Sequence, residues 1–232
     1  TLTAARARRG SIDGAQPPPA ATLRVAAAPR MALLRTWSED ALVTESAAAI
    51  TAMLTGEKVP NGVICVRSDA GGIVSLPTLL EIAEANGLST GVVSTARITH
   101  ATPAGAYAHV PDRGWEEVIA AQMLPGPGSP GLGNGIEVTL GGGRDYFVSA
   151  SSDGGRRRDG RNLLEEFEKA GYAVVSTGTE LRTLLASAPE RILGLFSGSH
   201  MAYELDRTGQ NLDQPSLAEM ANVALDILER NP

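Results

Sequence analysis

The sequence is poor in cysteine, histidine and aromatic residues. It contains one cysteine, Cys65, in 232 residues, so an internal disulfide cannot form and a cysteine-based metal site is excluded. Histidine occurs three times, as His100, His109 and His200, and aromatic residues make up only 4%. The core must therefore be built mainly from Val, Leu, Ile and Ala, with close approaches between backbone segments.

Other absences limit the function. No apolar run approaches the ~18 residues of a transmembrane helix, so membrane insertion is not expected. The net charge of −6 argues against nucleic acid as a partner. The first residues, TLTAARARRG, contain neither an initiating Met nor a signal peptide, and we expect that Thr1 is not the start of the natural polypeptide.

The residues that are present indicate one globular α/β domain over 1–232, with 43% hydrophobic and 20% charged residues. Strands are predicted at 62–67, 89–96, 136–143, 173–177 and 191–197, and helices at 75–87, 160–172, 179–188 and 216–231. This alternation predicts a mostly parallel central sheet with helices on both faces, and a β-α-β unit over 62–96.

Details of the helices and loops follow from local signals. Ser75 is the expected N-cap of the 75–87 helix, with Leu79, Leu80, Ile82 and Ala83 on its buried face. Leu163, Leu164, Phe167 and Ala170 should face inward from the 160–172 helix, and Ser216 and Glu219 should form a capping box. Flexible loops are expected at about 13–30, 124–135 and 151–160, the last with solvated arginines.

One serine stands out in LVTESAAAITAMLTG, residues 42–56. Ser46 follows Glu45 at the head of an alanine-rich helix, where free backbone N–H groups favour an anion. On position alone, an N-cap is the favoured interpretation, and a nucleophile is the alternative. Because neither G-x-S-x-G nor a Ser-His-Asp spacing is present, a nucleophilic serine would need another activator, usually a metal ion.

The stretch 94–113 contains further candidates at the end of a predicted strand. Thr102 either caps a short helix that runs to Arg113 or, with His100 two residues away in an extended loop, serves a hard cation. Arg113 is either a surface residue or a guanidinium fork for phosphate. His200 follows the strand at 191–197, and without a second ligand at a suitable spacing a structural role is expected.

Five segments, in matching order, resemble the alkaline phosphatases: TESAAAITAMLTGEKVPNGVI, LEIAEANGLSTGVVSTARITHATPAGAYAHVPDR, VTLGGGRDYF, GRNLLEEFEKAGY and LFSGSHMAYELDR. The resemblance covers nearly the whole chain except about 8–35 and 124–134. It implies a central sheet flanked by helices and hydrolysis of small phosphate monoesters through a phosphoserine intermediate. It also implies two zinc ions, one magnesium ion and an exported homodimer, periplasmic or secreted.

The resemblance also assigns roles to residues. Ser46 corresponds to the nucleophile, which a zinc ion activates, and Arg113 to the arginine that holds two phosphate oxygens. Thr102 corresponds to a magnesium ligand, and His100 lies near that magnesium, acting partly through water. Glu45 stands where the family has an aspartate that orients the arginine, so Arg113 is expected to be held differently.

The departures from the family pattern are large. Gly198 stands where the family often reads SDSH. The family's N-terminal metal-binding strand and its C-terminal zinc and magnesium ligands are absent from this sequence, and three histidines cannot build a two-zinc site. We therefore expect an incomplete sheet with an exposed edge, and a chain that is inactive or severely impaired by itself. The alternative is a non-catalytic phosphate-binding or interaction module; a phosphodiesterase or sulfatase relative fits the serine segment less well.

Overall fold

The computed structural model describes residues 35–126 and 131–230. By its internal contacts the chain divides into two units, residues 1–35 and 36–232. All the elements below belong to the second unit. The loop predicted at 13–30 lies outside the described residues, as do residues 127–130 within the loop predicted at 124–135.

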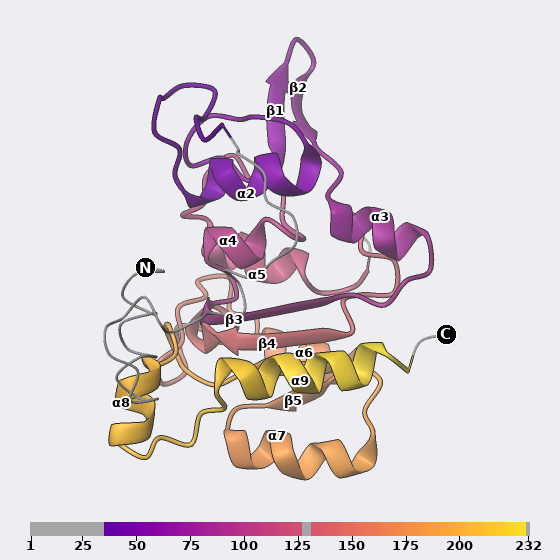
Figure 1. Ribbon diagram of the computed structural model, residues 1–232, viewed down its shortest axis with the longest axis vertical. Helices are drawn as coiled ribbons and strands as arrows, with labels where there is room; N and C mark the ends of the chain where they lie inside the picture. Colours follow the sequence, from indigo (N-terminus) through magenta and orange to yellow (C-terminus); the bar gives the residue numbers. More distant parts are fainter. Residues whose placement is uncertain (1–34, 127–130, 231–232) are drawn as a thin grey trace, which may run out of the picture. The chain divides into compact units, whose positions relative to one another are not determined.

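A four-stranded sheet forms the framework of the second unit (Figure 1). Its strands are β3 (Gly91–Arg97), β4 (Val138–Gly142), β5 (Ala173–Val175) and β6 (Ile192–Leu195). They lie in the order β3-β4-β6-β5, and every neighbouring pair is parallel. The predicted parallel sheet is therefore confirmed. Among the described residues β3 has a partner strand on one side only, so it is an edge strand of this sheet.

Helices cover both faces of the sheet, as predicted. On one face the core includes residues of α4 (Ala101–Ala104), α5 (Glu116–Gln122) and α6 (Leu163–Lys169), and on the other residues of α7 (Gly178–Leu184) and α9 (Leu217–Leu228). Because successive residues of a strand point to opposite faces, Leu193 joins the first cluster and Ile192 the second. The remaining helices are α2 (Ser46–Thr55), α3 (Leu79–Ala85) and α8 (Glu204–Gly209). The helices in the described part of the chain include none with the length and hydrophobicity needed to span a bilayer.

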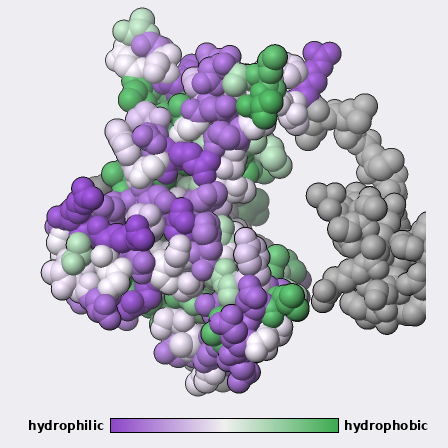
Figure 2. All heavy atoms as spheres, turned by 90° about the vertical axis from the view of Figure 1, so that its left-hand side faces the viewer, coloured by the Kyte–Doolittle hydropathy of each residue, from purple (hydrophilic) through white to green (hydrophobic). Residues whose placement is uncertain are grey.

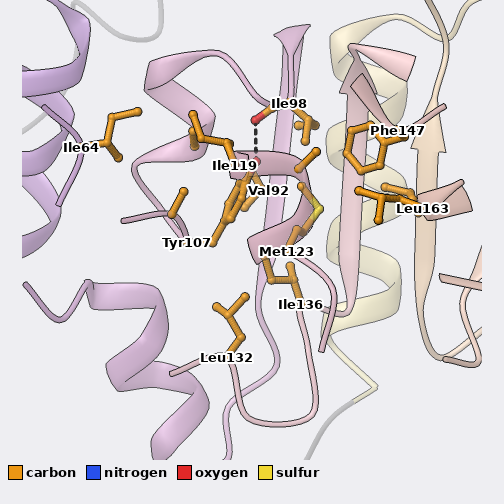
Figure 3. Close-up of a cluster of buried hydrophobic side chains, with 14 of the residues drawn as sticks. Ile64, Val92, Ile98, Tyr107, Ile119, Met123, Leu132, Ile136, Phe147 and Leu163 are labelled. Carbon is orange, nitrogen blue, oxygen red and sulfur yellow. Dashed lines mark hydrogen bonds between the residues drawn. The ribbon is translucent and has the colours of Figure 1, made fainter. Parts of the chain in front are cut away.

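The first cluster runs along one face of the sheet, from β3 to β6, and Figure 3 shows part of it. Tyr107 is fully buried there, and its hydroxyl donates a hydrogen bond of 3.0 Å to the carbonyl oxygen of Ile98. Without that partner, the buried hydroxyl would destabilise the core. Of the inward residues predicted for α6, Leu163 and Phe167 are fully buried, and Leu164 and Ala170 pack against the same cluster. That prediction is confirmed.

The predicted capping box of α9 is half formed. Ser216 accepts a hydrogen bond from the Glu219 N–H, but the Glu219 carboxylate binds Arg182 of α7 instead of returning to the cap. Complete boxes occur at two other helices, where Thr78 pairs with Glu81 and Thr177 with Glu180. A competing arginine on a neighbouring helix explains the difference, because a charged partner binds a carboxylate more strongly than a neutral N–H does.

The strand predicted at 62–67 does not join the parallel sheet. Ile64 forms an isolated antiparallel bridge with Val110, and β1 (Val66–Asp69) pairs with β2 (Gly72–Ser75) as an antiparallel hairpin. Cys65, between the bridge and the hairpin, has a φ of 46°, which interrupts the extended backbone. The predicted β-α-β unit over 62–96 is therefore wrong.

Helix α3 buries the predicted face only in part. Leu80 packs against the first cluster and Ala83 is half-buried, but two glutamates take the most buried positions. Its N-cap is Thr78 rather than Ser75, and its buried residues are Glu81 and Glu84, whereas Leu79 is 61% and Ile82 50% exposed. Each buried glutamate has polar partners: Glu81 binds Thr78 and His109, and Glu84 binds Thr90. Hydrogen bonding that apolar periodicity does not reveal therefore sets the orientation of this helix.

Both described loops contain buried residues that the sequence did not indicate. Leu132, in the loop predicted at 124–135, is 1% exposed and belongs to the core. Arg157, predicted to be solvated, is 2% exposed; it pairs with Asp159 and donates to the carbonyl oxygens of Glu117 and Tyr146. Arg156 and Arg158 are exposed as predicted. Arginine has five N–H donors, and these contacts let Arg157 be buried with its charge paired.

The packing predicts different costs for two matched leucine substitutions. Leu140→Ala, in the fully buried centre of β4, should lower the free energy of unfolding by about 2–5 kcal/mol, because it leaves a cavity under α9. Leu225→Ala, on the exposed side of α9, should change it by less than about 0.5 kcal/mol. Urea denaturation of both variants measures the difference, and equal costs would contradict the two-faced packing.

Candidate active site

Several candidate residues end or follow strands of the parallel sheet, and the carboxyl ends of β3 and β4 lie on the left of Figure 1. Arg97 ends β3 and is followed by His100, and the chain after β6 leads to His200. The carboxyl ends of parallel strands are the usual location of ligand sites in α/β proteins. Figure 2 looks onto this side, where hydrophilic residues predominate.

Glu45, and not Ser46, caps helix α2. Its carboxylate accepts hydrogen bonds of 2.9 Å from the N–H groups of Ala47 and Ala48, and a third of 2.9 Å from Gly62. Ser46 is the first residue of the helix. The N-cap interpretation of Ser46 is therefore wrong, because the longer side chain of the preceding residue reaches the same N–H groups. The anion-binding capacity of those two groups is already used by Glu45.

The Glu45 carboxylate is strongly acidic. Partial burial by itself raises its pKa, but hydrogen bonds from the three backbone N–H groups and from Arg113 outweigh burial and lower the pKa to about 2. Glu45 is therefore a carboxylate at every pH at which an enzyme normally works. A carboxylate of this acidity is a weak proton acceptor, and its evident role is to hold other groups in position.

Arg113 joins Glu45 to Ser46. Its Nη1 pairs with the Glu45 carboxylate and donates a hydrogen bond of 2.7 Å to the Ser46 hydroxyl oxygen. The side chains of Arg113 and Glu45 are 29% and 31% exposed, so the group is open to a ligand. The serine hydroxyl lies 3.4 Å from a Glu45 oxygen. A serine oxygen beside a guanidinium is favourably situated to carry negative charge.

Backbone contacts between two segments position Arg113. Its N–H donates to the Gly62 carbonyl oxygen at 2.8 Å, and Ile64 and Val110 exchange two hydrogen bonds of 3.0 Å. The helix predicted to run as far as Arg113 is therefore wrong, because α4 ends at Ala104. Gly105 follows α4 and lets it approach α2, where a Cβ atom would collide with Ile50.

His100 completes the hydrogen-bonded group. Its Nε2 lies 2.9 Å from Nη2 of Arg113. Burial, followed by the positive charge of Arg113, lowers the pKa of His100, so a neutral ring accepts this hydrogen bond. His100 is also the N-cap residue of α4, and Thr102 is an exposed residue of its first turn. Thr102 therefore does not cap the helix, and the two residues do not share an extended loop.

Sequence reasoning missed a second group beside the first. The ring of His200 lies 5.3 Å from that of His100, edge to face, and its nitrogens lie 3.1 Å from the backbone nitrogen and 2.8 Å from Nη1 of Arg97. Arg97 in turn makes two hydrogen bonds, of 2.9 and 2.8 Å, to the largely buried Glu116. The available signal was topological: Arg97 ends β3 and His200 follows β6, and both strands neighbour β4.

The donor set falls short of a metal site. Across residues 35–126 and 131–230, no three His, Cys, Asp or Glu side chains lie together as metal ligands. Nε2 of His100 faces Arg113, and the hydroxyl of Thr102 is a single hard donor, whereas zinc binds through about three or four protein ligands and magnesium through one or two carboxylates besides water. Gly198, which stands where the family pattern often has an aspartate, supplies no carboxylate either, and an added Cβ atom there would collide with the carboxylate of Asp145. The residues described here therefore do not fit the expected zinc and magnesium ions.

Comparisons with known proteins point to one family. The family model for alkaline phosphatase matches residues 1–232. A membrane-bound alkaline phosphatase of Bombyx mori is 35% identical over 266 residues, covering 100% of this chain and 47% of that protein. The crystal structure of Thermus thermophilus alkaline phosphatase matches with a TM-score of 0.79 and 35% identity, over 99% of this chain and 44% of that one.

A further solved structure concerns a metal. A variant of the alkaline phosphatase from the Antarctic bacterium TAB5, described with Mg bound in its M3 site, matches with a TM-score of 0.71 and 26% identity, over 90% of this chain and 54% of that one. The present chain thus spans about half the length of these relatives. With the family model matching from end to end, the chain belongs to the alkaline phosphatase family.

Proposed function

We propose that this chain supplies the nucleophile and the phosphate-binding arginine for hydrolysis of phosphate monoesters. The observation that carries the proposal is the hydrogen bond from Arg113 to the Ser46 hydroxyl oxygen, beside the Glu45 carboxylate. Family membership supports the same reaction class. A guanidinium recognises phosphate through two parallel N–H donors, and the side chain of Arg113 remains partly exposed.

The reaction would proceed in two displacements at phosphorus. The Ser46 hydroxyl gives up its proton to solvent as its oxygen forms a bond to phosphorus. The bond to the ester oxygen breaks, and the alcohol leaves with that electron pair and takes up a proton from solvent. Water then attacks the phosphoserine, and inorganic phosphate departs as the serine hydroxyl is restored. Arg113 would stabilise the charge on the phosphoryl oxygens during both steps.

Glu45 would hold the arginine rather than accept the serine proton. Partial burial raises the pKa of Glu45, but hydrogen bonds from three backbone N–H groups and Arg113 outweigh it and lower the pKa to about 2. The serine proton would therefore pass to a group other than Glu45. Since Nη2 of Arg113 faces His100, a bound phosphate would compete with the imidazole for that donor.

Metal ions would belong to the complete site. Two zinc ions and one magnesium ion, with Thr102 and His100 on the magnesium side, remain what the family resemblance predicts. The described residues do not fit those ions, so we propose that the 232-residue chain by itself turns over slowly or not at all. Export and a homodimer remain predictions of the same kind, as does a small phosphate monoester as substrate.

Substitution at the two central residues tests the proposal. In a chain lengthened at both ends to the size of its relatives, Ser46→Ala should lower kcat for p-nitrophenyl phosphate by at least about 10³-fold, because no oxygen remains to accept the phosphoryl group. Arg113→Lys should lower kcat/KM by about 10²-fold, because one ammonium cannot replace the fork. Full activity of Ser46→Ala would rule out the phosphoserine route.

Glu45 gives a second prediction. Glu45→Gln should lower kcat/KM by about 10- to 100-fold, because an amide cannot balance the charge of Arg113. Glu45→Asp should have a smaller effect, because it keeps the charge but shortens the reach. Steady-state kinetics measure both, and Glu57→Gln, which alters an ion pair with Arg67 that is about half exposed, is the matched control. Equal losses in all three variants would contradict a specific role for Glu45.

The activity of the chain alone gives the third test. We expect no turnover of p-nitrophenyl phosphate at alkaline pH by the 232-residue chain with Zn²⁺ and Mg²⁺, and metal-dependent turnover by the lengthened chain. Turnover by the short chain that a chelator abolishes would contradict this expectation. Binding of inorganic phosphate without turnover in either chain would instead favour the phosphate-binding module.

A further inference from the structure

His109 occupies a buried position outside the hydrogen-bonded group of Ser46 and Arg113. Its side chain is 3% exposed, and Nδ1 lies 2.8 Å from the carbonyl oxygen of Cys65. Nε2 lies 2.8 Å from one carboxylate oxygen of Glu81, whose other oxygen accepts the Thr78 N–H at 2.7 Å. Both partner atoms of the ring are therefore hydrogen-bond acceptors. An imidazole that donates from both nitrogens carries a positive charge.

Within residues 35–126 and 131–230, the ring of His109 faces one opposite charge. Glu81 of α3 is 7% exposed at its side chain and faces Nε2 directly. Helix α5 contributes Gln122, a neutral amide that binds both the N–H and the carbonyl oxygen of His109. Cys65 contributes a thiol that stays neutral, because burial raises its pKa to about 12. The adjacent cleft is otherwise lined by uncharged residues, Ser75, Pro77, Ile82, Ala85 and Gly131.

Cys65 connects this pair to the candidate active site. Its N–H donates to the Thr51 hydroxyl of α2 at 3.0 Å, and its thiol donates to the Gly105 carbonyl oxygen just after α4 at 3.2 Å. Its own carbonyl oxygen accepts both His109 and the Leu76 N–H. Cys65 adopts its left-handed backbone conformation, unfavourable for a residue with a side chain, only while such contacts hold it.

The segment 62–65 runs from Gly62 to Cys65, and Gly62 contacts two residues of the candidate active site, Glu45 and Arg113. The carbonyl oxygen of Gly62 accepts the Arg113 N–H, and the Gly62 N–H donates to Glu45. One short segment therefore touches the helix of Ser46, the arginine and the carboxylate that joins them. Any shift of Cys65 would be transmitted along it.

We propose that His109 is a buried imidazolium with Glu81 as its counter-ion, and that it positions Ser46 and Arg113 through the segment 62–65. The consequence for catalysis rests on the proposed function, whereas the charge and the coupling do not. A neutral His109 donates from one nitrogen only, so loss of the proton removes the hydrogen bond to Cys65 or the one to Glu81.

The direction of the pH effect follows from these contacts. Burial alone lowers the pKa of His109, but the hydrogen bonds to Glu81 and Cys65 outweigh burial, and the pKa is raised. The contribution of the pair to stability is therefore complete below the unfolded-state pKa of histidine, about 6.5. It is lost as the pH rises through the higher folded-state value. Rising pH should loosen the segment 62–65.

NMR spectroscopy of the 232-residue chain tests the charge and the coupling together. The ring ¹⁵N shifts of His109 and the amide shifts of Gly62, Cys65 and Thr51 are followed from about pH 6 to about pH 10. We expect both ring nitrogens to be protonated at neutral pH, and the three amides to change with the same midpoint as the ring. A singly protonated ring at neutral pH, or amides that ignore its titration, would overturn the proposal.

Two matched variants separate this pair from a general effect of α3. Glu81→Gln should lower the His109 midpoint by about one pH unit or more, because it removes the counter-ion. Glu84→Gln changes a buried glutamate of the same helix that binds Thr90 instead, and it should leave the midpoint unchanged. An equal shift in both variants, or none in Glu81→Gln, would contradict the assigned counter-ion.

Inorganic phosphate then tests the consequence for the site. We expect its affinity, measured by calorimetry, to fall about tenfold as His109 loses its proton, and the fall to move to lower pH in Glu81→Gln. If phosphate affinity depends on pH identically in the unsubstituted chain and in Glu81→Gln, the positioning role is overturned. If phosphate binds neither the 232-residue chain nor the lengthened chain at any pH, the proposed function and the positioning role both fail, while the NMR titration still decides the charge of His109 and its coupling to the segment 62–65.

Discussion

The candidate active site depends on the contacts of one carboxylate. Glu45 accepts three backbone N–H groups and pairs with Arg113, so a single side chain joins the start of α2, the residue Gly62 and the guanidinium. Each of these partners comes from a different part of the chain. Because the same carboxylate already occupies two N–H groups at the start of α2, any anion at this group would be attracted mainly by Arg113 and not by the helix.

The parallel sheet could be predicted because its strands are short apolar runs buried on both faces, and such runs are legible in a sequence. The hairpin and α3 could not be predicted in the same way. At Cys65 a left-handed residue interrupts a run that looks continuous. In α3 two glutamates turn inward because they form hydrogen bonds with His109 and Thr90, which lie outside the helix. Periodicity of apolar residues contains no information about such partners.

The sequence pattern singled out three residues of the candidate site. Ser46, Arg113 and His100 stand in a family pattern, and the structure brings them into one hydrogen-bonded group with Glu45. His200 and Arg97 are separated by 103 positions, and their contact follows only from the order of the strands, in which β3 and β6 both flank β4. The N-cap was misassigned by one residue, because a glutamate side chain is long enough to fold back over the first turn of its helix.

The buried thiol of Cys65 has a practical consequence. It is the sequence's single cysteine, it is 0% exposed, and burial raises its pKa to about 12, so a thiol reagent should not modify it while the fold is closed. Its modification therefore requires a local opening between α2 and α4. The rate at which a thiol reagent labels Cys65 would therefore measure how often α2 and α4 open locally around Ser46, without any introduced probe.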